Sequence, residues 1–142
     1  MSMNDMRGLW RGKRISGEGW VTGLLSYRSG KGVDDLNSAQ VYVERDYESY
    51  WVDPSTLGEC TGFLDKNDIL SFEEDIIKFK YGSETIVGFV EYDRYSGAFV
   101  VNDGVYSYIF GTDVFNAECE IIGNIHDNPE LLKGADDNGS RS

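Results

Sequence analysis

Short apolar and aromatic segments alternate with glycine-rich turns, at a spacing of about ten residues, along most of the chain. Such segments, rich in β-branched and aromatic residues, are typical of an all-β protein. Polar and apolar residues alternate along Lys78–Tyr81, which predicts a strand with one buried face. The segments Gly88–Val90 and Phe99–Val101 contain no polar residue, which predicts strands buried on both faces. The predicted strands are Arg7–Trp10, Trp20–Tyr27, Gln40–Arg45, Tyr50–Val52, Asp75–Tyr81, Thr85–Tyr92, Ala98–Val101, Tyr106–Phe110 and Glu120–Ile125.

Turn residues separate these strands. Asp103-Gly104 is a dipeptide of tight hairpins, and Asp65–Asp68 predicts an Asx-type turn, in which acidic and amide side chains bond the nearby backbone. Asp65–Asp68 also begins like a calcium loop, but Leu70 and Ile76 stand where such a loop needs glycine and glutamate. Helix is expected only as single turns, at Pro54–Leu57 and Asn128–Leu132.

Length and composition predict one domain. The 142 residues, 40% of them hydrophobic, are enough for one core and a tail. We expect a single β domain over residues 6–133, a flexible N-terminus over 1–5, a mobile loop at Ser29–Ser38 and a disordered tail over 134–142. No apolar run reaches the roughly 18 residues of a membrane span, and no signal peptide is visible. A cytoplasmic protein with no membrane partner is therefore expected.

Charge is divided unevenly along the chain, whose net charge is −12. Six basic and two acidic residues give +4 to residues 1–31, and seven basic and 23 acidic residues give −16 to residues 32–142. A body this acidic repels phosphate, so direct nucleic-acid binding through it is not expected. Dense carboxylates instead either imitate the field of a nucleic acid or keep the protein soluble.

The residues show no catalytic constellation. His126 is the only histidine, and Cys60 and Cys119 have neither zinc nor redox spacing. Both are expected to be reduced, buried thiols, and the alternative is a disulfide between them. Carboxylates in the run Glu73–Asp75 point to alternate faces of an extended chain, so they do not converge with Asp65 on a metal. We assign no catalytic, cofactor-binding or metal-binding residues. A carboxylate- and metal-dependent enzyme is the weakest of the functions considered.

Aromatic residues are the best candidates for an interaction surface, because tyrosine is enriched at protein interfaces. The tryptophans suit either a peptide-binding groove or a core. The basic stretch Arg7–Arg14 contains the first predicted strand, and an exposed edge there would favour association with a second copy of the chain. The alternative is that this strand packs within its own barrel and its arginines pair with acidic residues of the same chain. The candidate interaction surface consists of Arg7, Trp10, Arg11, Tyr42, Tyr47, Tyr50 and Tyr95.

Four blocks of the sequence follow one another in a recognisable order: Met6–Arg14 with Gly19–Val21, Val52–Gly62, Leu64–Asn67 with Phe72–Ile77, and Glu120–Ile125 with Asn128–Leu132. In these blocks the chain resembles the YopX-like proteins of phages and prophages. Asp68 and Glu74 stand where the family pattern has glycine, and His126 stands where it has tyrosine.

The resemblance implies a small SH3-like barrel, here with extra N-terminal strands and a short C-terminal helical turn. It also implies a phage or prophage origin, but no established biochemical activity and no catalytic residues. We therefore expect a non-enzymatic accessory protein that contacts a host or phage protein in the host cytoplasm. The alternative is an acidic mimic of nucleic acid that inhibits a host DNA-binding protein.

Overall fold

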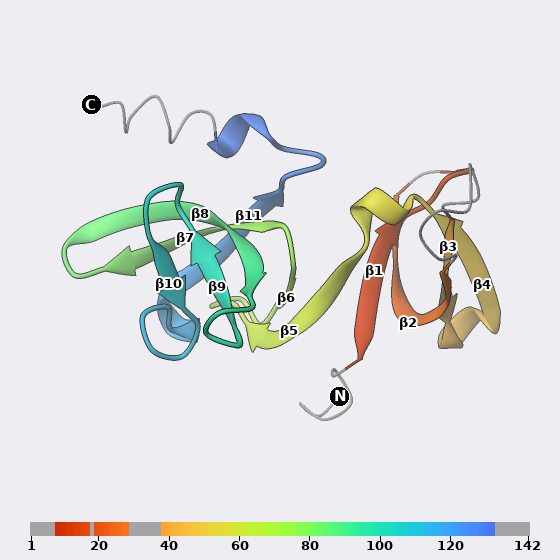
Figure 1. Ribbon diagram of the computed structural model, residues 1–142, viewed down its shortest axis with the longest axis horizontal. Helices are drawn as coiled ribbons and strands as arrows, with labels where there is room; N and C mark the ends of the chain where they lie inside the picture. The colour runs from red at the N-terminus through yellow and green to blue at the C-terminus, as the bar shows by residue number, and fades with distance from the viewer. Residues whose placement is uncertain (1–7, 18, 29–37, 133–142) are drawn as a thin grey trace. The chain divides into compact units, whose positions relative to one another are not determined.

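The computed structural model describes residues 8–17, 19–28 and 38–132 (Figure 1). Contacts along the chain divide it into two compact units, residues 1–60 and residues 61–142. The expectation of one domain over 6–133 stays a prediction. Arg7, the segment 1–5, most of the Ser29–Ser38 loop and the tail from 134 lie outside the described residues.

The all-β class is confirmed, while the SH3-like barrel stays a prediction. Figure 1 shows the strands in both units. The first unit contains β1 (Leu9–Lys13), β2 (Trp20–Arg28), β3 (Ala39–Val43) and β4 (Glu48–Val52). Next, β5 (Gly58–Leu64) runs across the boundary. The second unit continues with β6 (Leu70–Phe72), β7 (Asp75–Tyr81), β8 (Glu84–Asp93), β9 (Ala98–Asn102), β10 (Ser107–Ile109) and β11 (Cys119–Asn124).

Helical structure in the described residues consists of short turns. The 3-10 turns are η1 (Glu44–Asp46), η2 (Pro54–Thr56) and η3 (Asn116–Glu118). Asp53 caps η2 by accepting a hydrogen bond from the backbone N–H of Ser55, and this confirms the predicted turn after Pro54. The predicted C-terminal turn is also present, since the N–H of Leu131 bonds to the carbonyl of Asn128.

The first unit holds the strands β4-β3-β2-β1 and the start of β5 from an antiparallel sheet of six strands in the order β4-β3-β2-β1-β5-β6, and β6 belongs to the second unit. Its inner face buries Ala39, Val41 and Val52. Arg14, just after β1, forms a bridge to Val52 of β4, so the sheet curls until β1 reaches its far strand. A Cβ atom on Gly12 would lie 2.8 Å from the side chain of Val52, which explains why glycine occupies this point of β1.

The expectation that the first strand is a free edge is wrong. β1 pairs with β2 over Leu9–Lys13 and with the start of β5 at Trp10 and Arg11. Its backbone is therefore engaged on both sides, and the strand is interior to the sheet of the first unit.

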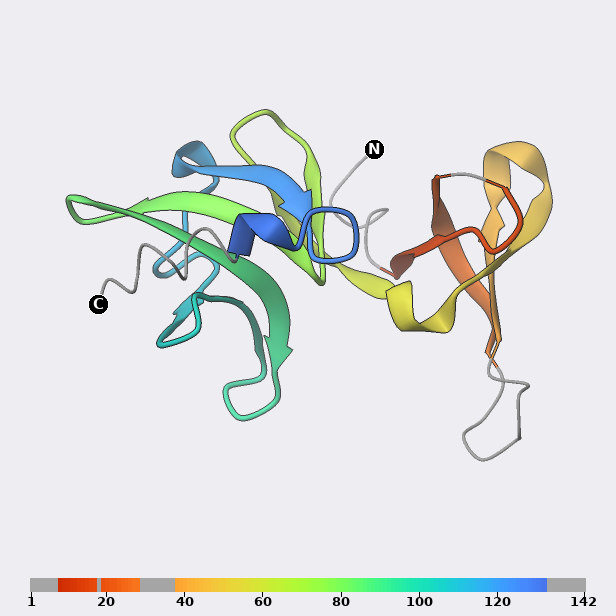
Figure 2. The same ribbon diagram turned by 90° about the horizontal axis from the view of Figure 1, so that it is seen from above.

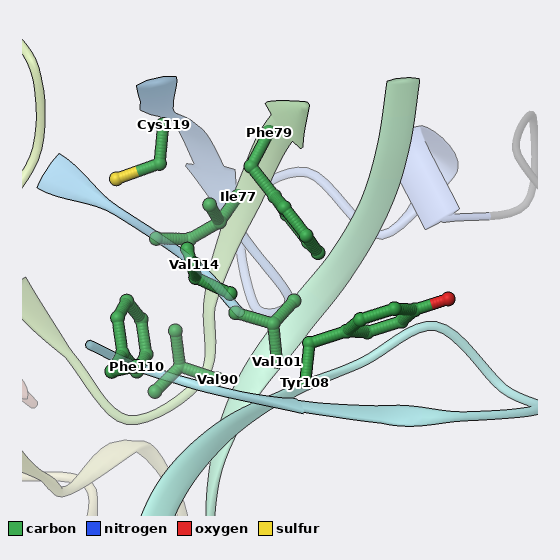
Figure 3. Packing of buried hydrophobic residues seen from close by; sticks show 8 residues of the cluster. All are labelled: Ile77, Phe79, Val90, Val101, Tyr108, Phe110, Val114 and Cys119. Carbon is green, nitrogen blue, oxygen red and sulfur yellow. The ribbon is translucent and has the colours of Figure 1, made fainter. Parts of the chain in front are cut away.

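The second unit is an antiparallel sheet in the order β10-β9-β8-β7-β11. Figure 2 shows β7 and β8, in green, as its long hairpin. Ile77 and Phe79 of β7 pack with Val90, Val101 and residues from β10 and the following loops, as Figure 3 shows. The predicted range Asp75–Tyr81 matches β7.

Two strand expectations need correction. Gly88 and Val90 are buried, but Phe89 between them is only half-buried, so β8 has one core face instead of two. Val100 and Val101 are both buried, as predicted for their run. The predicted strand Gln40–Arg45 ends at Val43, because the chain turns into η1, which Tyr47 closes with a φ of 53°.

Candidate interaction groove

A groove of about 810 Å³ lies over the face of β1, β2 and β3 that is turned away from the core of the first unit. Cross-strand register builds this face. Leu24 of β2 lies opposite both Leu9 of β1 and Tyr42 of β3, and all three line the groove. Trp20 belongs to the same face, because side chains two residues apart on a strand point the same way.

Arginine side chains cover two aromatic rings of this unit. The guanidinium of Arg11 lies 4.9 Å from the ring centre of Trp20, and that of Arg14 lies 4.8 Å from the ring centre of Tyr50. Both distances are within the range of cation–π attraction. Arg11 therefore helps to fix the orientation of Trp20 in the groove. Arg14 instead covers Tyr50, which lies opposite the buried Val41 on the other face of the sheet.

The rim of the groove is polar and is formed by η1. Arg45 Nε lies 3.4 Å from Asp46 Oδ1, and the hydroxyl of Tyr50 donates a 2.8 Å hydrogen bond to Asp46 Oδ2. This hydrogen bond raises the pKa of Tyr50, because it favours the neutral phenol. An apolar floor with a charged rim is the usual composition of a protein-binding surface.

The structure gathers part of the predicted interaction surface around this groove. Tyr42 lines it, Arg11 covers Trp20, and Tyr50 bonds to the rim, with the exposed Tyr47 next in sequence to Asp46. Trp10 lies on the opposite face of β1, across from Gly23. The last predicted residue, Tyr95, is in the second unit, almost fully exposed in the β8–β9 loop.

Sequence reasoning missed Leu24 as a groove residue, and it left Trp20 open between a peptide-binding groove and a core. Their strand contains apolar residues on both faces, at Trp20, Val21, Leu24 and Leu25, so alternation did not separate an outer face from an inner one. The exposed fraction of Leu24, 53%, is the signal that distinguishes it from the partly buried Leu25, which packs against the core.

The carboxylates singled out by the sequence have structural partners in the second unit. Asp65 is buried, and its Oδ1 accepts hydrogen bonds from the N–H groups of Asn67 and Ile69, which confirms the Asx-type turn. The buried carboxylate of Asp75 accepts from the N–H of Phe72. Within the described ranges, no three His, Cys, Asp or Glu residues are grouped as a metal site.

His126 lies just after β11, where its Nε2 is 2.5 Å from Glu74 Oε1. Glu74 has a φ of 73°, the left-handed geometry that the family pattern fills with glycine. The N–H of Ile125 bonds to the carbonyl of Glu74, so backbone and side-chain contacts both join this turn to the segment after β11. The two contacts therefore tie the segment directly after β11 to the β6–β7 turn.

Both cysteines are free and buried, as predicted. Burial, together with the nearby charge of Asp65, raises the pKa of Cys119 to about 11. Since the thiolate is the reactive form, this shift and the burial of Cys119 both disfavour its reaction at neutral pH.

Together, the sheets and the groove define an all-β protein with an aromatic groove on one face of its first unit. A family model described as YopX protein matches residues 20–133. This match covers most of the chain and reaches into both units, so the chain belongs to the YopX family. A search of curated proteins gives no match. Across the described residues, none of the helices has the length and apolar character needed to span a bilayer.

Proposed function

We propose that this protein is a non-enzymatic accessory protein of a phage or prophage that acts in the host cytoplasm by binding another protein through the groove of its first unit. The observation that carries the proposal is the exposure of Leu24 beside Trp20 and Tyr42 on one sheet face. Aromatic side chains and arginine are the residue types that dominate binding energy at protein interfaces.

The form of the groove favours an extended partner segment. Its floor is crossed by three adjacent strands, and its apolar side chains alternate with polar ones such as Thr22. Grooves of this kind accept peptides whose alternate side chains fill apolar positions. A host or phage protein with an exposed apolar segment is the partner class that this surface fits.

The test compares two substitutions of equally exposed side chains. Leu24→Glu places a charge in the groove, and Ile69→Glu places the same charge on an apolar residue of the second unit, where 54% of the side chain is exposed against 53% for Leu24. Affinity capture from host lysate is expected to yield a partner with the wild type and with Ile69→Glu, but not with Leu24→Glu. Equal capture by all three proteins would exclude the groove as the binding site.

An acidic mimic of nucleic acid is the second candidate, and the division of charge between the units favours it. Residues 1–60 carry seven basic and nine acidic residues, net −2, whereas residues 61–142 carry six basic and 16 acidic residues, net −10. The second unit therefore holds most of the negative charge.

Salt dependence separates this candidate from the first. A mimic is expected to lose its basic partner between about 0.01 M and 0.15 M salt, since the screening length falls from about 30 Å to about 8 Å. Retention of the partner at the higher salt would favour the apolar groove.

Self-association is a separate proposal. An exposed edge of β1 does not support self-association, because β1 is paired on both sides. Sedimentation at low and moderate salt tests it, and a mass of 16.0 kDa at both would exclude a homo-oligomer.

A further inference from the structure

Three tyrosines gather at one end of the core of the second unit, and we call them the tyrosine cluster: Tyr81, Tyr106 and Tyr108. The ring of Tyr108 packs edge-on against Tyr81, 5.0 Å away, and against Tyr106, 6.4 Å away. Tyr108 itself is 8% exposed, whereas Tyr81 and Tyr106 are 46% and 66% exposed. In the tyrosine cluster, the exposed rings of Tyr81 and Tyr106 therefore pack against the buried ring of Tyr108.

The core holds Tyr108 in place. Its ring meets Phe79 at 5.2 Å, and its hydroxyl points away from Phe110 in Figure 3. Tyr81 continues the row formed by Ile77 and Phe79, because alternate side chains of β7 share one face. The two hairpin ends, 81–84 and 102–107, are thus brought together by aromatic contacts.

Two carboxylates border the tyrosine cluster. Asp103 Oδ2 accepts a 3.2 Å hydrogen bond from the hydroxyl of Tyr108, and its Oδ1 accepts from the N–H groups of Val105 and Tyr106. Glu84 lies directly opposite Tyr81 in the β7–β8 hairpin, on the same face of the sheet. The hydrogen bonds of Asp103 therefore hold the loop that carries Tyr106 in one conformation in the unbound protein.

The electrostatic field at the cluster is negative. Burial, together with the charge and hydrogen bond of Asp103 and the charge of Glu84, raises the pKa of Tyr108 to about 12. Among the described residues, no lysine or arginine lies over these three rings, in contrast to Tyr50, which Arg14 covers. The negative carboxylates and the aromatic faces of the tyrosine cluster are thus both complementary to a cation.

We infer that the tyrosine cluster is a second interaction surface, which binds a lysine or arginine side chain in a basic segment of a protein partner. The cation lies over the rings of Tyr81 and Tyr106 and between the carboxylates of Glu84 and Asp103. Aromatic faces attract cations, and a hydrogen-bonded loop loses little conformational freedom on binding. The inference rests on the proposed action through protein contacts and adds a site with its own partner chemistry.

The probe is a short arginine-containing peptide, with a matched peptide in which citrulline replaces arginine. Citrulline keeps the shape of the side chain but carries no charge. NMR titration of the full chain is expected to shift the amide signals of Val105 and Tyr106 with the arginine peptide only. The arginine peptide is expected to leave the tryptophan emission unchanged, because Trp10, Trp20 and Trp51 all belong to the first unit.

Matched variants separate local contacts from the general field of the protein. Tyr106→Leu and Glu84→Gln are each expected to weaken peptide binding by about fivefold. Tyr95→Leu, beyond the opposite end of β8, and Glu130→Gln, which removes the same charge elsewhere, are expected to leave binding unchanged.

Some results would overturn the inference: no binding of the arginine peptide, equal binding of the citrulline peptide, or equal weakening by the control variants. Leu24→Glu distinguishes this surface from the groove, since it is expected to leave peptide binding unchanged even if it abolishes capture of the groove partner.

Discussion

Asp65 Oδ2 accepts a 3.0 Å hydrogen bond from the backbone N–H of Ile121, a residue 56 positions further along the chain. The same carboxylate holds the Asx-type turn through Oδ1, so one buried side chain joins the start of the second unit to its last strand. Asp65 is therefore a structural residue of the sheet, not a member of a reactive cluster.

The substitution Asp65→Asn is expected to destabilise the protein by about 2–3 kcal/mol. The amide has one acceptor oxygen, so either the turn or Ile121 would face an NH₂ group with a donor of its own. Urea unfolding at neutral pH measures the loss. Asp68→Asn, which removes the same charge from an exposed position of that turn, is expected to change the unfolding free energy by less than about 0.5 kcal/mol.

Acid is expected to remove the stabilisation by Asp65. Burial opposes its charge, but the N–H groups of Ile121, Ile69 and Asn67 outweigh burial and hold its pKa below the ordinary value of 3.8. Because the folded pKa is the lower one, the contribution is complete above the unfolded pKa and is lost as pH falls through the folded pKa. The stability difference between wild type and Asp65→Asn should thus shrink below about pH 4. A constant difference down to pH 2 would contradict this assignment.

Asp68→Gly is expected to stabilise the protein by about 0.5–1 kcal/mol. Asp68 has a φ of 63°, a conformation that costs a side chain with a Cβ atom more than it costs glycine. Asn67→Gly, one residue earlier and outside the left-handed region, is the control and is expected to lower stability. Thermal unfolding of both variants tests the difference, and a lower melting temperature for Asp68→Gly would refute it.

Gly23→Ala is expected to cost about 3 kcal/mol or more. The added Cβ would lie 1.9 Å from the carbonyl oxygen of Tyr42, and backbone cannot move aside as a flexible side chain would. Thr22→Ala, on the exposed face of the same strand, is the matched control with little expected effect. Tryptophan emission follows unfolding of the first unit in both variants, and similar midpoints would show that β2 and β3 tolerate the methyl group.

The alternation of apolar and polar residues along the sequence predicted the strands that bury one face in a core, and β7 is the clearest of them. It missed β5, because Thr61 and Gly62 interrupt the apolar alternation. There the side-chain hydroxyl of Thr61 bonds to Ser71 of β6, a partner ten positions away that periodicity does not reveal. At Asp68 and Glu74, where the family pattern has glycine, the backbone is left-handed, which the residue types of this chain alone did not predict.

The interaction groove was predicted only in part for a related reason. Tyr42 was identifiable from its residue type, but its alignment with Leu24 and Leu9 depends on the register of three strands. Register is fixed by pairing across turns and loops, not by the composition of one strand.

The position of Tyr108 has a consequence for hydrogen exchange. β10 is only three residues long and ends the sheet of the second unit, so its amides would ordinarily exchange by fraying. To release β10, however, the ring of Tyr108 must leave its contact with Phe79 in the core. The amide proton of Tyr108, opposite Val101 of β9, is therefore expected to exchange more slowly than fraying of a three-residue edge strand alone would allow.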